Sequence, residues 1–214
     1  MISFDRGEAL RYMGYHGAVP DAAVAESLER CAAELQAAVQ PKSISARFPL
    51  SFTGENTMQI GDLTVTSANL ARNLRGCTEV YLMAATLGIG ADRLIARASA
   101  VRMSDAVILQ AVAAAMIETC CDEVNDALRR TAEQEGLYCR PRFSPGYGDF
   151  SIEHQRDFSR LLDTPRKIGL TVTESCLLAP IKSVTAVIGL SPEKQDCHRK
   201  GCEECGKTDC NFRR

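Results

Sequence analysis

The sequence predicts an α+β protein, with helices packed on a mixed, mainly antiparallel sheet around one long central core helix. Apolar residues recur at helical spacing over residues 24–39 and alternate at strand spacing over residues 44–52. A third segment, from about residue 104 to residue 130, is apolar on nearly all sides over its first half, which is typical of a buried helix. Helical and strand patterns follow one another without a βαβ rhythm, which disfavours a parallel sheet.

Local signals divide the first half of the chain into short elements. Asp5 and Glu8 resemble a capping box that begins a short helix, ahead of the amphipathic helix over residues 24–39. Turn signals after the alternating strand predict a small antiparallel sheet, with Pro49 at an edge or a bulge because proline cannot donate a ladder hydrogen bond. Ser67 is expected to cap another short helix.

The second half begins with a continuous apolar run, residues 80–87, as expected of a strand buried on both faces. Gly88 and Gly90 follow, but a dinucleotide-binding fingerprint would need glycine where Arg93 stands. A tight strand-to-helix turn is therefore the preferred interpretation. Three further elements are predicted downstream: a helix around residues 152–162, a strand over residues 168–175 and a strand over residues 183–190.

Composition restricts the partners and the compartment. The 214 residues carry a formal net charge of −2 and no basic stripe, which argues against nucleic acid as the main partner. The N-terminus lacks the apolar core of a signal peptide, and the strongest apolar run is shorter than the ~20 residues needed to cross a bilayer. We therefore expect a cytoplasmic protein that does not bind membranes.

One loop, residues 139–149, concentrates turn-forming and polar residues. A Pro-Gly pair ending at Gly146 predicts a type II turn, and Arg142 offers a fork of donors suited to a carboxylate or phosphate. Tyr147 offers a stacking face, and Asp149 can accept hydrogen bonds from an amine or a ribose. The loop would suit a small zwitterionic or nucleoside-bearing ligand, with an ordinary surface turn as the alternative.

Three sequence blocks resemble the activation domain of cobalamin-dependent methionine synthase. Residues 142–147, Arg-Phe-Ser-Pro-Gly-Tyr, are similar to its R-x-x-x-G-Y signature. Residues 168–175, Ile-Gly-Leu-Thr-Val-Thr-Glu-Ser, are similar to its I-G-x-x-L-T-E-S strand, and residues 183–186 resemble the strand that follows. The blocks keep the order and spacing of the family, and they lie within residues 139–192.

The resemblance implies binding of S-adenosylmethionine, with the ligand carboxylate on Arg142 and with Ser144 and Gly146 lining the pocket. Tyr147 and Glu174 complete the candidate binding residues. The implied reaction is reductive reactivation, in which cob(II)alamin takes one electron from a flavodoxin-like or ferredoxin-like donor and a methyl group from S-adenosylmethionine. Whether the chain itself is an enzyme or an accessory domain stays open.

The resemblance also implies that cobalamin comes on a partner, either a cobalamin-bearing methionine synthase or another corrinoid protein. His16, His154 and His198 lack the D-x-H-x-x-G context of a cobalt ligand. Ile188 and Gly189 stand where full-length synthases have Tyr-Phe, so an aromatic contact to the ligand is missing. The Pro-Ala-Cys-Pro stretch that follows Gly-Tyr in those enzymes and the aspartate of their N-terminal extension also have no counterpart here.

Ten cysteines divide into six scattered ones, expected to be buried small hydrophobes, and four in a polar tail. The tail pattern C-x4-C-x2-C-x4-C predicts a metal site, because so polar a segment cannot bury thiols in a core. We expect an iron–sulfur cluster, with zinc as the alternative and an oxidised or disordered tail as the competing interpretation. The ligands would be the four tail cysteines, Cys197, Cys202, Cys205 and Cys210.

The expected organisation is an activation-like domain over residues 1–192, whose first 42 residues form a helical part, and a cysteine-rich metal-binding tail over residues 193–214. A second hypothesis keeps the same organisation but makes the protein a non-catalytic iron–sulfur or zinc module that docks on and reduces a corrinoid protein. A third is an unrelated small-molecule-binding protein that uses the same loop.

Overall fold

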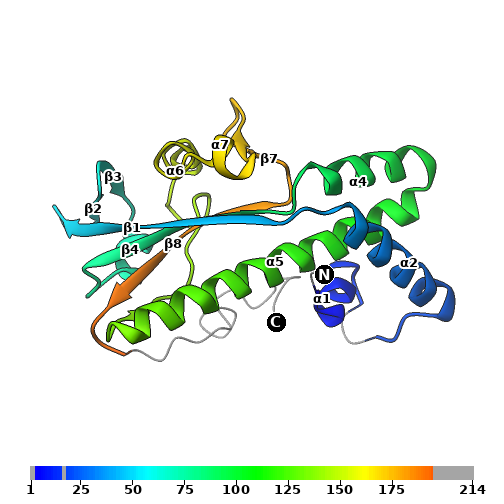
Figure 1. Ribbon diagram of the computed structural model, residues 1–214, viewed down its shortest axis with the longest axis horizontal. Helices are drawn as coiled ribbons and strands as arrows, with labels where there is room; N and C mark the ends of the chain where they lie inside the picture. The colour runs from blue at the N-terminus through cyan, green and yellow to red at the C-terminus, as the bar shows by residue number, and fades with distance from the viewer. Residues whose placement is uncertain (1–2, 16–17, 195–214) are drawn as a thin grey trace.

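A six-stranded sheet with helices on both faces organises the computed structural model, which describes residues 3–15 and 18–194 (Figure 1). The strand order is β3-β2-β1-β4-β8-β5, and every pairing is antiparallel, so the predicted α+β class is confirmed without a parallel component. Helix α5 (Met103–Gln134) runs along one face, and α6 (Gln155–Leu162) and α7 (Thr164–Ile168) cover the other (Figure 1).

The sheet is built around two long central strands, β4 (Glu79–Thr86) and β8 (Ser183–Ser191), which pair along their whole lengths. On the other side of β4 lies β1 (Lys42–Phe52), followed by β2 (Thr57–Ile60) and β3 (Leu63–Thr66). Strand β1 changes partner at Pro49: it pairs with β4 up to this residue and with β2 beyond it. The proline therefore lies where one ladder ends, as its missing N–H requires.

Two hydrophobic clusters, one on each face, hold the layers together. Met83 and Ile188 point toward α5, while Leu82 and Val187 point toward α6 and α7. The alternation follows the two-residue period of a strand, and burial on both faces explains why β4 is apolar from Val80 to Ala85. Two fully buried aromatic residues, Phe150 and Phe158, fill the α6 side, with ring centroids 6.3 Å apart.

Helix α5 is the core helix that the sequence predicts. Among the described residues it is the one helix long and apolar enough to cross a bilayer, but 61% of its most apolar window is buried inside the fold. Such burial is typical of a core helix. It begins at Met103 after Arg102 and continues four residues past the predicted end at Arg130.

Helices α1 (Arg6–Tyr12), α2 (Ala22–Ala38) and α4 (Ile89–Val101) pack against α5. Asp5 caps α1 by accepting a hydrogen bond from the Glu8 N–H at 3.1 Å, so the predicted N-cap is present. The short helix α3 (Ala68–Asn73) is capped by Ser67, whose Oγ accepts from the Leu70 N–H at 3.0 Å, again as predicted.

The segment from residue 152 to residue 179 departs from prediction. The expected helix starts as a single 3-10 turn, Ile152–His154, before α6. The expected strand over residues 168–175 is wrong for most of its length: Ile168 ends α7, Gly169 is left-handed (φ 70°), and only β6 (Thr171–Val172) pairs with β7 (Leu178–Ala179). Pro165 in the first turn of α7 favours a helix that ends at Ile168, the first residue of the predicted strand.

Candidate functional site

The loop at residues 139–149 follows the short strand β5 (Tyr138–Cys139) and is fixed by helix α3 at both of its ends. Asp149 accepts hydrogen bonds from the N-terminus of α3: from Ser67 Oγ at 2.5 Å, from the Ala68 N–H at 2.7 Å, and from the Asn69 N–H and side-chain amide at 3.1 and 3.0 Å. The bond from Ser67, with those from the helix backbone, holds the pKa of Asp149 well below its usual range. Asp149 therefore caps a helix, which corrects its expected contact with an amine or ribose.

At the other end of α3, Arg140 is 5% exposed and donates from Nη2 to the Arg75 carbonyl at 3.2 Å. Gly148 must approach α3 closely, because a Cβ there would lie 2.6 Å from Asn69 Nδ2, and its φ is +57°. The loop thus lies along α3, and its middle residues are presented by a rigid support.

The middle of the loop forms the predicted turn. Gly146 has φ +95°, and the Tyr147 N–H donates to the Ser144 carbonyl at 3.2 Å, which closes a four-residue turn. Pro145 is buried, whereas the Tyr147 side chain is 69% exposed. An exposed ring above a Pro-Gly turn is free to cover a ligand.

Arg142 crosses to the α5 face of the sheet. Its Nη2 donates to Glu118 Oε2 at 3.2 Å, and its Nη1 lies 2.9 Å from Asp122 Oδ1 in an ion pair. Nη1 is buried and, within the described part of the chain, makes no hydrogen bond of acceptable geometry. The guanidinium therefore lies between two carboxylates, and its Nη1 group forms an ion pair without a well-aligned hydrogen bond.

Beside Arg142, strand β8 has an open edge. Phe143 and Val187 exchange both backbone hydrogen bonds, at 2.9 and 2.8 Å, so Val187 presents its backbone to the outer side of the sheet. Thr185, two residues earlier, presents its N–H and C=O to the same side. No described strand pairs with Thr185 on that side, so one backbone donor and one acceptor have no strand partner there, in a residue that is 2% exposed.

Lys182 marks the far end of this edge. Its Nζ donates to the Gln110 carbonyl of α5 at 3.2 Å, and burial lowers the pKa of its ammonium group. Gln110 and Glu118 are eight residues apart on α5, which corresponds to about 12 Å along the helix axis. The open edge is thus bounded by an arginine with two carboxylates at one end and by a lysine at the other.

Four of the five predicted binding residues, Arg142, Ser144, Gly146 and Tyr147, lie in one loop, but Arg142 contacts α5 whereas Gly146 lies against Ile152. Glu174 does not join them. It is exposed in the turn between β6 and β7, on the α6–α7 side of the sheet, where its carbonyl accepts from Arg156 Nη2 at 2.6 Å (Figure 1).

Sequence reasoning missed Glu118 and Asp122. One signal was available: Glu118 interrupts the longest apolar run of the chain, and an acidic residue in a buried helix usually has a partner. The partner itself is 24 positions away in the sequence, in a loop whose course depends on α3.

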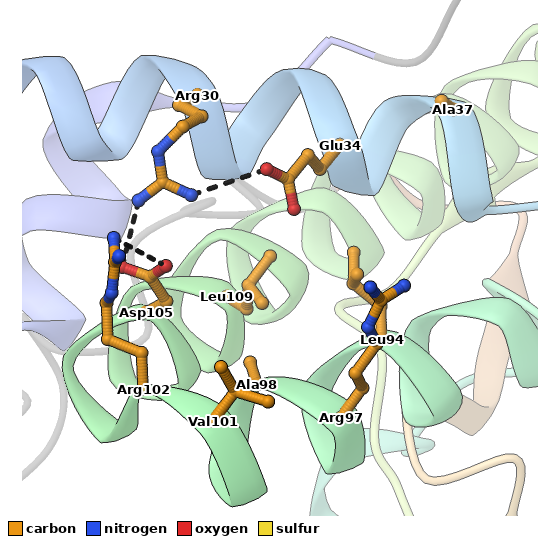
Figure 2. A pocket seen from close by; sticks show the side chains of 10 residues that line it. All are labelled: Arg30, Glu34, Ala37, Leu94, Arg97, Ala98, Val101, Arg102, Asp105 and Leu109. Carbon is orange, nitrogen blue, oxygen red and sulfur yellow. Dashed lines mark hydrogen bonds and ion pairs between the residues drawn. The ribbon is translucent and has the colours of Figure 1, made fainter.

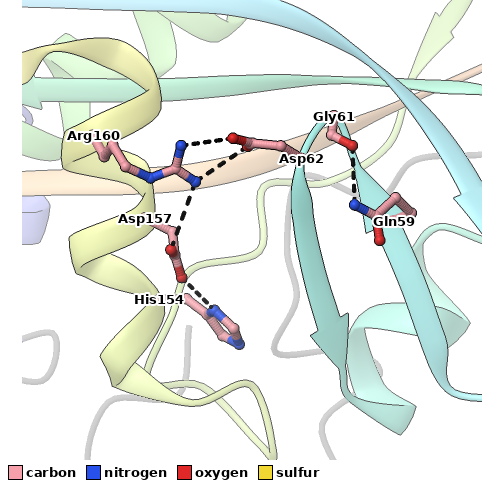
Figure 3. Close-up of polar contacts among 6 residues, drawn as sticks. All are labelled: Gln59, Gly61, Asp62, His154, Asp157 and Arg160. Atoms are coloured by element: carbon pink, nitrogen blue, oxygen red, sulfur yellow. Dashed lines mark hydrogen bonds and ion pairs between the residues drawn. The ribbon is translucent and has the colours of Figure 1, made fainter.

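His154 takes part in a network that attaches α6 to the β2–β3 hairpin (Figure 3). Its Nδ1 lies 2.9 Å from Asp157 Oδ2, and Arg160 on the same helix donates to Asp62 of the hairpin at 2.7 and 3.1 Å. The imidazole also packs on Phe150, with ring centroids 5.3 Å apart. His154 is thus hydrogen-bonded and structural. His16 and His198 lie outside the described residues.

Packing accounts for the missing aromatic pair in β8. Ile188 is fully buried and points into the α5 core. A Cβ on Gly189 would lie 2.7 Å from both Cys77 Sγ and Leu74 Cδ2, so position 189 has no room for a side chain. The open edge consequently has no aromatic contribution from these two positions.

All six scattered cysteines are buried as free thiols, which confirms their prediction as small core residues. Burial raises the pKa of several of them, that of Cys121 to about 12. No group of three or more potential metal ligands occurs among residues 3–15 and 18–194. The tail cysteines, Cys197, Cys202, Cys205 and Cys210, lie outside the described residues, so the metal site stays a prediction.

Comparison with solved structures finds a similar chain, described as "Crystal Structure of the MetH Reactivation Domain bound to AdoHcy". The two chains superpose with a TM-score of 0.66, which covers 90% of this chain and 75% of the other, at 16% sequence identity. No protein-family model and no curated protein matches the sequence. At this identity the likeness shows a shared fold.

Proposed function

We propose that this protein binds S-adenosylmethionine and serves in the reductive reactivation of a cobalamin-dependent methionine synthase held on a separate chain. Two independent observations support the proposal. The three sequence blocks resemble the activation domain, and the fold is that of a MetH reactivation domain whose structure contains AdoHcy. Since fold alone does not determine function, the proposal depends on the site.

The pairing of Arg142 with Glu118 and Asp122 beside the open edge of β8 is the observation that carries the proposal. The methionine end of S-adenosylmethionine is a zwitterion, with a carboxylate and an ammonium group attached to the same α-carbon. Arg142 is suited to the carboxylate, and Glu118 or Asp122 is suited to the ammonium group. In the free protein Arg142 forms ion pairs with both carboxylates, and the ligand would exchange these ion pairs for its own.

The remainder of the ligand would extend along the open edge. Ser144 and Gly146 would line its path through the turn, Thr185 would offer backbone hydrogen bonds, and Tyr147 would stack from outside. Glu174 stays a candidate through its sequence block alone, because it lies on the other side of the sheet.

The chain's own residues would bind and orient the ligand rather than transfer protons. The carboxylates of Glu118 and Asp122 also favour the cationic sulfonium over the neutral thioether that remains when the sulfur–methyl bond breaks. The partner's cobalamin, reduced by one electron from a flavodoxin-like or ferredoxin-like donor, supplies the nucleophile for the methyl group. The released product is S-adenosylhomocysteine.

The cysteine tail is proposed to hold an iron–sulfur cluster, or zinc, and reduction of cobalamin is the reason to prefer a cluster. In the alternative function the protein is a non-catalytic iron–sulfur or zinc module that docks on and reduces a corrinoid protein, and the Arg142 site has no ligand. The proposed reaction and the six buried free thiols both suit a cytoplasmic location.

Calorimetric titration with S-adenosylmethionine distinguishes the two functions. We expect saturable binding by the wild-type protein, weakened at least about tenfold by Arg142→Gln and by Glu118→Gln, because each removes a charge-assisted hydrogen bond to the ligand. Arg129→Gln is the matched control, since Arg129 lies on α5 and pairs with Asp126 at 3.4 Å, away from the open edge. Absence of binding by the wild type, or equal affinity of Arg142→Gln and Arg129→Gln, contradicts the proposed site.

A further inference from the structure

A separate pocket of about 600 Å³ lies between α2, α4 and α5 (Figure 2). It opens about 14 Å along the α5 axis from the Arg142 site, since Leu109 in its wall is nine residues before Glu118. Its lining combines small or apolar side chains with charged ones: Arg30, Glu34, Ala37, Leu94, Arg97, Ala98, Val101, Arg102, Asp105 and Leu109.

Both ends of the pocket are held in place. At one end α2 and α4 touch, because Gly90 has no side chain and a Cβ there would overlap the Ala38 carbonyl. At the other end Arg30 donates to Asp105 at 2.9 Å and to Glu34 at 3.3 Å (Figure 2). The opening is thus framed by a backbone contact and by an ion-pair cluster.

The charges around the pocket do not balance. Three arginines face two carboxylates in the lining. Arg30 forms ion pairs with Glu34 and Asp105, and Arg102 forms a longer one of 3.6 Å with Asp105, so these two arginines balance the two carboxylates. Within the described part of the chain Arg97 has no hydrogen-bond or ion-pair partner, and Figure 2 shows its side chain rising from α4 toward α2 across the opening.

The floor of the pocket is apolar. Leu94, Ala98 and Leu109 form it, and Val101 at the rim is 80% exposed. Small-molecule sites typically measure about 300–1,000 Å³ and combine an apolar lining with a few placed polar groups. This pocket meets both conditions, with Arg97 as the unpaired charge.

We infer that the pocket binds a small amphiphilic anion, a molecule with an apolar body and one carboxylate, sulfonate or phosphate group. The apolar body would cover Leu94, Ala98 and Leu109, and the anionic group would pair with Arg97. This site is independent of the proposed function, since no residue is shared between the two.

Fluorescence titration with 8-anilinonaphthalene-1-sulfonate tests the inference, because this probe joins an aromatic body to one anionic group. We expect saturable binding with one probe per chain and about tenfold weaker binding by Arg97→Gln. Arg93→Gln is the matched control, since Arg93 is exposed one turn earlier on α4 and does not line the pocket. Ala37→Phe, which fills the pocket from α2, should also abolish binding, whereas Ala96→Phe on the outside of α4 should not.

Competition experiments identify the anionic class. Octanoate and octyl phosphate should displace the probe, and the stronger competitor shows which head group is preferred. Octanol, which lacks the charge, and inorganic phosphate, which lacks the apolar body, should displace it poorly. Equal probe affinity of Arg97→Gln and Arg93→Gln, retention of binding by Ala37→Phe, or a titration that does not saturate at one site would overturn the inference.

Discussion

Gly189 is the position at which packing most sharply constrains the sequence of β8. An alanine there would place its Cβ 2.7 Å from Cys77 Sγ, 2.7 Å from Leu74 Cδ2 and 3.1 Å from Arg140 Cγ. Favourable contacts between heavy atoms lie near 3.5–4.0 Å, so the methyl group would overlap two neighbours by roughly 1 Å. All three neighbours are buried, which leaves little space for relaxation.

We therefore expect Gly189→Ala to destabilise the protein. Overpacking in a rigid core costs about 1–3 kcal/mol, and the lower chain entropy of alanine in the unfolded state offsets about 0.5–1 kcal/mol of it. The net loss is about 1–2 kcal/mol, which for a chain of this size lowers Tm by about 2–8 °C. Urea denaturation followed by circular dichroism measures it.

Two further variants isolate the cause. Gly54→Ala serves as the control, because a Cβ there would meet Thr57 no closer than 3.6 Å, and its stability should match or slightly exceed that of the wild type. Cys77→Ala combined with Gly189→Ala should recover part of the loss, since the sulfur contact is gone. A Gly189→Ala protein as stable as the wild type would refute the packing argument.

Three other outcomes are expected. Asp149→Asn should lower Tm at neutral pH, and the difference in Tm from the wild type should shrink as pH falls through the native pKa of Asp149. The reason is that a carboxylate whose pKa is lowered by folding stabilises the protein above about pH 4 and loses that effect when it is protonated. A difference in Tm that grows toward acid pH contradicts the capping role. Titration of the native protein with a thiol reagent near pH 8 should leave Cys121 and the other five described cysteines unmodified until denaturant is added. These thiols are buried, and burial raises the pKa of Cys121 to about 12. Rapid modification of these six cysteines in the native state would contradict their burial. Anaerobically purified protein should show visible charge-transfer absorption that disappears when the four tail cysteines are changed to serine, whereas a colourless protein with stoichiometric zinc would exclude the cluster.

Elements with strong periodicity or clear caps were predictable from the sequence. The first half of helix α5 is apolar on nearly all sides because it lies between the sheet and other helices, and strand β4 is apolar from Val80 to Ala85 because both of its faces are covered. The caps at Asp5 and Ser67 depend on short local hydrogen bonds, which a sequence pattern encodes directly.

Features set by tertiary contacts were not predictable in the same way. Residues 168–175 look like a strand by composition, yet α7 ends at Ile168, Gly169 is left-handed, and only Thr171–Val172 forms a strand. Asp149 was expected to contact a ligand, but the N-terminus of α3 approaches it from 80 residues away. The ion pairs of Arg142 with Glu118 and Asp122 depend on the same loop path, so the arginine of the candidate site was predicted and its acidic partners were not.

Transfer of a labelled methyl group tests the proposed function most directly. The protein would be mixed with methyl-labelled S-adenosylmethionine, a reductant and a cobalamin-bearing methionine synthase that lacks its own activation domain. We predict one labelled methyl group on each cobalamin with wild-type protein, none without reductant, and a severe loss with Arg142→Gln but not with Arg129→Gln. Reduction of cobalamin without labelled methyl transfer, under conditions in which S-adenosylmethionine is abundant, would contradict the account and favour the non-catalytic redox module.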